Sequence, residues 1–240
     1  MTAALTWSYH TSHMALANST RAHHPRKAVA LLQTPQDALD LRPENRLALD
    51  NVQMSPGHRD LLTIDELPVP AEQLVKQIQG IILVDHPEPL SVWQQARILS
   101  IFDHHKDRGI APSAQPRIFE GTASCTTIVA REMLNELESL REEYHVPHEV
   151  VELILDAIAL DSDGLNKATP EDIFISRRLL KRSNWRSEKL LDVMRRLDRD
   201  MSRAKKDLDH LGVRDLLRRD WKGEAQEERR RDRQASDSVL

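Results

Sequence analysis

The hydrophobic positions of the chain first indicate its strands. Residues 80–84 (GIILV) and 98–102 (ILSIF) are continuously hydrophobic, which is typical of strands that are buried on both faces of a parallel sheet. Residues 27–33 and 61–67 are further strand candidates. Seventeen residues lie between Asp85 and Asp103, which is enough for a crossover connection. The two strong strands are therefore predicted to be parallel neighbours.

Helical periodicity alternates with these strands. It predicts helices over residues 7–17, 71–79, 90–96, 124–144 and 148–161. Residues 36–52, which contain Pro43, are predicted to form a helical or irregular connection. From residue 177 onward one or two amphipathic helices are predicted, because hydrophobic residues recur at helical spacing at Leu190, Met194, Leu197, Met201, Leu208 and Leu211. The alternation predicts an α/β fold with a parallel, Rossmann-like sheet.

Length and composition limit the class of protein. A chain of 240 residues, 40% hydrophobic and 30% charged, can bury the core of one large domain, or of one domain and part of a second. No hydrophobic run approaches the roughly 20 residues of a membrane span, and the N-terminus lacks a signal pattern. We therefore expect a cytoplasmic protein without a membrane partner. The single cysteine, Cys125, excludes a disulfide framework and a cysteine-based zinc site.

Charge is distributed unevenly along the chain. Residues 1–176 contain 14 Lys and Arg against 25 Asp and Glu, whereas residues 177–240 contain 20 against 13. The first part can concentrate divalent cations, and the second can attract anions. The basic residues of 177–186 alternate with a hydrophobic stripe, which favours a solvated linker helix over a nucleic-acid interface. Residues 223–240 are polar and are predicted to be disordered.

Acidic and imidazole side chains follow both strong strands. Asp85 comes directly after the first strand, and Asp103, His104 and His105 end the second. The carboxyl ends of parallel strands meet at one edge, so these side chains should share a crevice. Carboxylates and imidazoles without thiolates suit Mn²⁺ or Mg²⁺, and a bridging aspartate would permit a two-metal site for phosphate hydrolysis. Such residues also occur in solvated loops and helix caps, so spacing alone leaves both interpretations open.

Several ordered motifs carry a resemblance to a known family. They are ILVDHPEP (82–89), SIFDHHKD (100–107), ASCTTIVA (123–130) and LILDAIALDSDGLNKATPED (153–172). In this order they resemble the DHH phosphoesterase superfamily, in its exopolyphosphatase and prune-like branch, which is akin to the family II inorganic pyrophosphatases. DALDLRPENRLAL (37–49) resembles a further segment of that branch, and LGVRDLLRRDWK (211–222) resembles the beginning of its DHHA2 domain.

The resemblance implies roles for individual residues. Asp85 would bridge two metal ions, and His104 and Asp161 would ligate one of them. His105 would face the substrate phosphate as a hydrogen-bond donor or proton source, so that Asp85 and His105 are the catalytic candidates. The turn of Ser124, Thr126 and Thr127 would lie near the anion, with Lys167 beside the site. An ordinary helix cap explains the turn equally well, and a surface turn explains Lys167.

The resemblance also implies a domain organisation. Residues 1–176 would form the DHH domain, residues 177–222 linker helices and the start of a DHHA2 domain, and residues 223–240 a tail. The family's first motif, Asp-x-Asp followed by Ser, normally comes directly before a helix that resembles residues 5–13. Since Met1 lies only four residues before Leu5, we expect that motif, the first core strand and the carboxylates of the other metal to be missing. A shortened second domain should impair closure over the substrate.

Three functional hypotheses follow. The first is a metal-dependent phosphoanhydride hydrolase of exopolyphosphatase or pyrophosphatase type, acting on polyphosphate or pyrophosphate and impaired in this chain. The second is a non-catalytic, prune-like binding or regulatory protein, and the third is an incomplete fragment. The DHH nucleases typically carry a Gly-Gly-Gly-His signature. This chain has 7 glycines and no Gly-Gly pair, so no nucleic-acid partner is expected.

Overall fold

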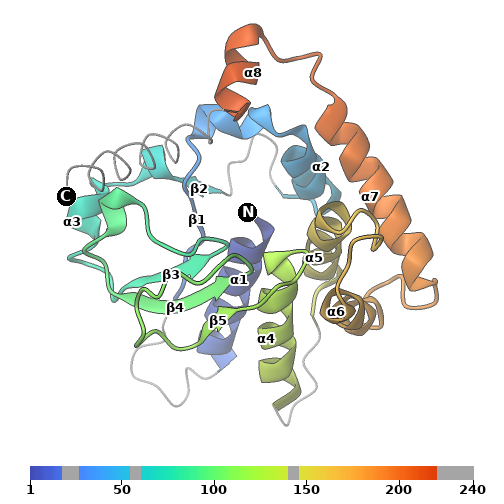
Figure 1. Ribbon diagram of the computed structural model, residues 1–240, viewed down its shortest axis with the longest axis horizontal. Helices are drawn as coiled ribbons and strands as arrows, with labels where there is room; N and C mark the ends of the chain where they lie inside the picture. Colours follow the sequence, from blue (N-terminus) through green and yellow to red (C-terminus); the bar gives the residue numbers. More distant parts are fainter. Residues whose placement is uncertain (18–26, 55–60, 140–145, 221–240) are drawn as a thin grey trace, which may run out of the picture.

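The computed structural model describes residues 1–17, 27–54, 61–139 and 146–220, in which strands and helices alternate (Figure 1). The strands are β1 (Leu31–Leu32), β2 (Leu62–Thr63), β3 (Ile81–Val84), β4 (Ile98–Asp103) and β5 (Arg117–Phe119). The α-helices are α1 (Thr2–Ala17), α2 (Pro43–Asn51), α3 (Ala71–Leu74), α4 (Cys125–Ser139), α5 (His148–Asp161), α6 (Pro170–Leu180), α7 (Leu190–Lys206) and α8 (Val213–Asp220). Short 3-10 helices are η1 (Gln36–Leu41), η3 (Ile64–Glu66) and η4 (Ser91–Trp93).

The described strands form two parallel sheets. One has the order β3-β4-β5, and the other is the pair β1-β2. Strands β3 and β4 are parallel neighbours, with Leu83 opposite Ile101 and Val84 opposite Phe102, as predicted. Strand β5 was not predicted, because its three residues are only partly buried and give no clear periodicity. The prediction of an α/β fold with a parallel sheet is confirmed.

Several predicted elements are shorter than their sequence patterns. Strands β1 and β2 have two residues each, where residues 27–33 and 61–67 were predicted. Strand β2 stops because the side chains of Thr63 and Glu66 form a capping box that begins η3. Helix α3 has four residues, and the predicted helix over 90–96 is reduced to η4. In these four short elements, the sequence pattern therefore extends over more residues than the regular secondary structure does.

The three-stranded sheet is covered on both faces. On one face, Phe102 packs with Trp7 of α1 and with Ile128 of α4. On the other face, Ile101 packs with Leu83 and Ala114. Figure 1 shows α1 and α4 side by side next to this sheet. Burial on both faces explains why β3 and β4 are continuously hydrophobic, as the sequence predicted.

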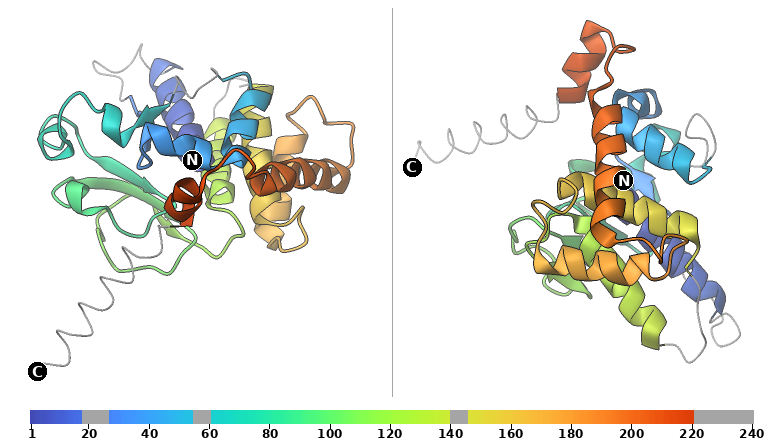
Figure 2. Two further views of the ribbon diagram at one scale, coloured as in Figure 1. Left: turned by 90° about the horizontal axis from the view of Figure 1, so that it is seen from above. Right: turned by 90° about the vertical axis from the view of Figure 1, so that its right-hand side faces the viewer.

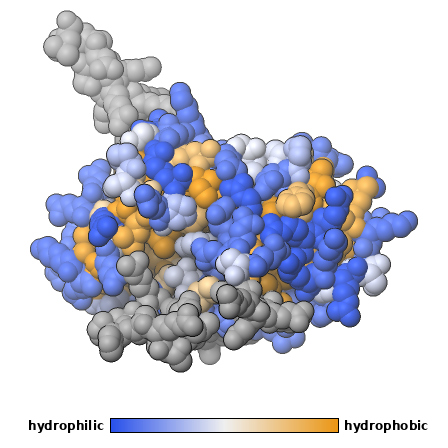
Figure 3. All heavy atoms as spheres, turned by 90° about the horizontal axis from the view of Figure 1, so that it is seen from below, coloured by the Kyte–Doolittle hydropathy of each residue, from blue (hydrophilic) through white to orange (hydrophobic). Residues whose placement is uncertain are grey.

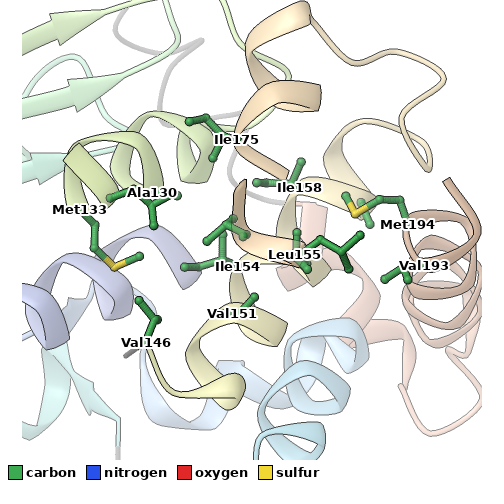
Figure 4. Packing of buried hydrophobic residues seen from close by; sticks show 14 of the residues in the cluster. Ala130, Met133, Val146, Val151, Ile154, Leu155, Ile158, Ile175, Val193 and Met194 are labelled. Atoms are coloured by element: carbon green, nitrogen blue, oxygen red, sulfur yellow. The ribbon is translucent and has the colours of Figure 1, made fainter. Parts of the chain in front are cut away.

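A second core lies among the helices, with α5 at its centre. Ile154 and Ile158 of α5 are fully buried there, together with Met133 of α4, Ile175 of α6 and Met194 of α7 (Figure 4). Full burial of a side chain of this size contributes about 1.5–3 kcal/mol of transfer free energy. The packing fixes the axis of α5, and with it the position of Asp161 at the end of the helix.

The C-terminal helices differ in part from prediction. Helix α6 begins at Pro170, seven residues before the predicted start at 177, because Thr169 and Asp172 form a capping box there. Residue 177, where the second unit was expected to begin, lies inside this helix. Helix α7 buries the predicted residues Met194, Leu197 and Met201 but ends at Lys206, so the predicted positions 208 and 211 lie beyond it.

Helix α8 stands at the end of α7, away from the three-stranded sheet (Figure 2). It contacts η1, where Arg218 pairs with Asp37 at 2.8 Å. Hydrophilic side chains predominate on the face shown in Figure 3, around separate hydrophobic areas. Among the described helices, none has the length and hydrophobicity needed to cross a bilayer. The predicted disorder of residues 223–240 concerns a segment outside the described residues.

Candidate metal and phosphate site

Asp85 lies where β3 ends, in an uncommon backbone conformation. Its φ is 63°, in the left-handed region that residues other than glycine rarely adopt. Its N–H donates to the carbonyl oxygen of Phe102 at 2.9 Å, so Asp85 still pairs with β4. Its side chain is 49% exposed. Backbone conformations of this kind gather at ligand and active sites, and this one places a carboxylate at the edge of the sheet.

His104 is held by interactions at both of its ring nitrogens. Its Nδ1 lies 3.0 Å from the carbonyl oxygen of Thr122, which can only accept, so Nδ1 carries a proton. Its Nε2 lies 3.2 Å from Oδ1 of Asp85. Metal-binding histidines commonly donate one ring N–H to a carbonyl group and use the other nitrogen as the ligand. The orientation of His104 fits this arrangement, with Nε2 toward Asp85.

The charges of Asp85 and His104 depend on each other. The hydrogen bond with Asp85, helped by the carbonyl of Thr122, outweighs burial and raises the pKa of His104 to about 9. Burial alone would raise the pKa of Asp85, but the hydrogen bond from His104 and the positive charges nearby lower it instead. Without a cation the two residues form an ion pair. A divalent cation at the same two atoms would replace the proton on Nε2.

Asp103 orients His105. Its carboxylate is fully buried, and its Oδ1 lies 2.7 Å from Nδ1 of His105 and accepts the backbone N–H groups of His104 and His105. Because the carboxylate accepts, Nδ1 of His105 is the donor, and Nε2 is the nitrogen that can contact a ligand. The imidazole of His105 is 56% exposed. The sequence placed Asp103 in the motif but did not predict this role. The position of Asp103 just before two histidines is the signal that could have indicated it.

Asp85, His104 and His105 can act together on one ion. Each offers one ligand atom, and these atoms lie within 4.8 Å of one another. Oxygen and imidazole donors without sulfur suit a hard or borderline divalent cation, so the residues present fit the expected group. This cluster, found among the described residues, does not include Asp161.

Asp161 lies near the cluster at the end of α5. It keeps solvent contact, yet burial by its surroundings is the main cause that raises its pKa. A hydrogen bond from the Ser124 hydroxyl lowers the pKa, the negative charge of Asp85 raises it, and the positive charge of His104 lowers it. Asp161 is therefore within electrostatic reach of the two other predicted metal ligands and in contact with the predicted turn.

The predicted phosphate-binding turn lies at the start of α4. Ser124, Thr126 and Thr127 are all buried, and Oγ of Ser124 accepts the N–H of Thr126 at 3.2 Å, as a capping hydroxyl does. The Thr127 hydroxyl donates to Oδ1 of Asp172. Cys125 is buried and its Sγ lies 3.2 Å from the Phe102 carbonyl oxygen. Burial raises the pKa of its thiol far above the ordinary value, which excludes a thiolate nucleophile.

Two further residues complete the surroundings of the site. Lys167 is 75% exposed, and its Nζ lies 3.5 Å from Asp163, an ion pair of a kind that contributes about 0–1 kcal/mol. Asp172, in contrast, is fully buried and hydrogen-bonded to the turn before α4. Sequence reasoning did not select Asp172. The spacing from Thr169 to Asp172 marks it as a capping residue, but no sequence signal reveals its long-range contacts.

Comparisons with known proteins bear on the homology and on the fold of the chain. No family model matches the chain. A protein of Schizosaccharomyces pombe (strain 972 / ATCC 24843) named "Putative exopolyphosphatase" is 30% identical over 212 residues, which cover 82% of this chain and 52% of that protein. The structure also matches that of a Methanococcus jannaschii protein described as a "putative family II inorganic pyrophosphatase", with a TM-score of 0.52 and 17% identity. This match covers 72% of this chain and 53% of the other.

The two comparisons bear on different properties. The chain spans about half the length of each of these two proteins. The structural match, at low identity, concerns the fold alone. The chain is thus homologous to the S. pombe protein over most of its own length, and its α/β fold with parallel sheets is that of the M. jannaschii pyrophosphatase-like structure.

Proposed function

We propose that this protein is a metal-dependent phosphoanhydride hydrolase of the DHH superfamily, acting on polyphosphate or pyrophosphate. The observation that carries the proposal is the placement of His104, whose Nδ1 is bonded to a carbonyl group while its Nε2 points to Asp85 at 3.2 Å. The names of the two matched proteins support the same reaction class. The proposal also includes a cytoplasmic location and membership of the prune-like branch. It further includes the beginning of a DHHA2 domain within residues 177–222.

The proposed metal ligands are Asp85, His104 and Asp161, and the ion is Mn²⁺ or Mg²⁺. When bound, such an ion lowers the pKa of a water molecule and offsets negative charge on a phosphoryl oxygen. Asp85 and His104 hold the ion at the edge of the sheet, since their ligand atoms belong to one cluster. Asp161 joins from the end of α5, where the nearby Ser124 hydroxyl lowers the pKa of its carboxyl.

His105 is the proposed proton donor to a phosphate oxygen. Asp103 fixes its Nδ1, so the proton that moves is the one on Nε2, on the exposed side of the ring. Asp85 is the second residue of the proposed catalytic pair. Its Oδ1 lies 4.0 Å from Nδ1 of His105.

The start of α4 is the proposed anion side of the site. A helix beginning favours negative charge; Ser124 caps this helix and Thr126 lies in its first turn. Thr127 supports the turn, because its hydroxyl is buried and bonded to Asp172. Lys167 is exposed and only weakly paired, so its ammonium group can turn toward an anionic substrate.

We also propose that the 240-residue chain turns over slowly. Among the described residues the proposed ligands are Asp85, His104 and Asp161, which suffice for one ion and leave a second ion with few ligands. Two ions clamp the attacking and leaving oxygens together, so a single ion gives weaker transition-state stabilisation. If the chain binds one ion without any turnover, the non-catalytic, prune-like role is the better description.

The test is phosphate release from polyphosphate and from pyrophosphate, with Mn²⁺ or Mg²⁺ added to the metal-free chain. Asp85→Asn and His104→Gln should abolish the metal-dependent release. Asp192→Asn, which removes an exposed carboxylate on α7, should leave it unchanged. Release that is independent of metal, or that survives both site variants, would contradict the proposal.

A further inference from the structure

We propose that Asp172 is a positioning residue that holds the segment 122–127 in the place where it orients the proposed metal ligand His104 and lies beside the proposed ligand Asp161. Asp172 lies in the first turn of α6, and none of the hydrogen bonds that its carboxylate accepts comes from a proposed metal ligand. Its effect on metal binding rests on the proposed function, whereas its effect on the segment does not.

The Asp172 carboxylate joins two parts of the chain that are far apart in sequence. Its Oδ2 accepts the backbone N–H of Ala123 at 2.9 Å, and its Oδ1 accepts the hydroxyl of Thr127. These partners lie 49 and 45 residues away along the chain. Oδ2 also accepts the N–H and the hydroxyl of Thr169, at 2.8 and 2.7 Å. One buried carboxylate therefore fixes the start of α6 to both sides of Ser124.

The residues between these two anchors touch the site. Thr122, next to Ala123, provides the carbonyl oxygen that accepts the Nδ1 proton of His104. Ser124, on the other side of Ala123, has its hydroxyl close enough to Asp161 to lower the pKa of that carboxyl. The bond from Ala123 to Asp172 lies between these two contacts. A shift of the segment would therefore change the orientation of His104 and the surroundings of Asp161 together.

A carboxylate is the group that this position requires. The Asp172 side chain acts only as an acceptor in its four hydrogen bonds to other residues, and two carboxylate oxygens supply enough acceptor sites for them. An asparagine amide would place an NH₂ group opposite a donor. Burial would raise the pKa of Asp172, but the hydrogen bonds from Thr127, Ala123 and Thr169 lower it, so the carboxylate is ionised. Its charge is balanced by oriented donors.

A purely structural role for Asp172 makes a different prediction. Asp172 also caps α6, so its replacement destabilises the helix as loss of any cap does. Ile175 lies on the same helix, is fully buried, and belongs to a hydrophobic cluster that includes no residue of the 122–127 segment. Ile175→Ala therefore serves as a control that lowers stability without touching the segment.

The experiment compares the full chain with its Asp172→Asn, Thr127→Val and Ile175→Ala variants. Mn²⁺ affinity is measured by calorimetry and Tm by thermal unfolding. The rate of amide hydrogen exchange is measured for the peptide that covers residues 122–127. We expect Asp172→Asn to weaken Mn²⁺ binding about tenfold, as loss of a group behind a metal ligand does. It should also speed exchange in this peptide more than elsewhere. Thr127→Val should weaken binding less, and Ile175→Ala should lower Tm with Mn²⁺ affinity unchanged.

Two results would overturn the inference. One is that Asp172→Asn lowers Tm without selective exchange in residues 122–127. The other is that Ile175→Ala weakens Mn²⁺ binding as much as Asp172→Asn does. If the wild-type chain binds no Mn²⁺, the proposed function fails. The exchange data then decide on Asp172 alone, since they require neither metal nor turnover.

Discussion

The Nε2 atom of His104 lies 3.2 Å from Oδ1 of Asp85, and these two residues come from the ends of neighbouring parallel strands. The contact joins the two motifs that the sequence placed after its strongest strands. It also puts a proton between the same atoms that a divalent cation would bind. The proposed metal site is therefore filled by an ion pair when no cation is present.

A first prediction concerns stabilisation by metal. Mn²⁺ at a free concentration of 100 times its Kd should stabilise the folded chain by about 2.7 kcal/mol, because the unfolded chain lacks the site. Asp85→Asn should remove this gain, and a chelator should reverse it in the wild type. Thermal unfolding with and without Mn²⁺ measures the effect, with Asp192→Asn as the control. An equal rise in Tm for Asp85→Asn would contradict the assignment of Asp85.

A second prediction concerns the pH dependence of metal binding. The pKa of His104 is raised to about 9, so at pH 7 its Nε2 carries a proton that must leave when a metal binds. The pKa of Asp85 is lowered, so its carboxylate is already ionised. Apparent affinity should therefore rise about tenfold per pH unit from pH 7 and level off above about pH 9.

Calorimetry in buffers of different ionisation enthalpy measures the proton that is released. About one proton per Mn²⁺ is expected at pH 7, and almost none near pH 10. Binding that releases no proton at pH 7 would show that His104 is not the ligand or is not protonated in the metal-free chain.

A third prediction concerns Asp156 in α5. It is 1% exposed, and its oxygens lack a well-formed hydrogen bond, although the Asn51 amide favours the charged form. Burial, then the negative charge of Glu152, raises its pKa from 3.8 to about 7. A raised pKa in the folded state means that stability is lost as pH rises from about 4 to about 7. The loss is roughly 4 kcal/mol at most.

Asp156→Asn should remove most of this pH dependence and should make the chain more stable than the wild type at pH 8. Denaturant unfolding at pH 5, 6, 7 and 8 measures both effects. Asp192→Asn, on the exposed side of α7, should follow the wild-type curve. If Asp156→Asn is less stable than the wild type at pH 8, the buried carboxylate is stabilised by partners, and the predicted ionisation cost is wrong.

A fourth prediction concerns Cys125. Its thiol is buried, and burial together with the nearby charges of Asp85 and Asp103 raises its pKa. Alkylating reagents should therefore leave the folded chain unmodified over hours, and treatment should not change phosphate release. Mass spectrometry before and after unfolding in urea measures the modification. Rapid labelling of the folded chain would contradict the burial of this residue.

The parts of the fold that the sequence predicted well are those with long or fully buried patterns. Strands β3 and β4 and helices α4 and α5 appear where hydrophobic runs are continuous or regularly spaced. Strand β5 escaped prediction because three partly buried residues carry too little pattern. Strand β2 was overestimated because the local capping box from Thr63 to Glu66 competes with strand pairing.

For the site, sequence patterns identified the residues but not their supports. The strand ends predicted that Asp85 and His104 would meet, and the structure brings them together. The contact of Asp172 with Ala123 spans 49 residues, and no local pattern encodes such a distance. The orientation of His105 by Asp103 depends on how the chain turns after β4, which the order of residues alone does not give.

The bond between His104 and the carbonyl oxygen of Thr122 has a consequence for how this protein can vary. The acceptor is a main-chain atom, which every amino acid supplies, so no single codon change at position 122 deletes it. The Thr122 hydroxyl donates to the carbonyl oxygen of Ser124 at 2.8 Å, so a substitution at this position acts on His104 only through the backbone of the segment. The orientation of His104 depends on the path of the backbone. Substitutions that change this orientation must therefore occur at residues that hold the backbone in place.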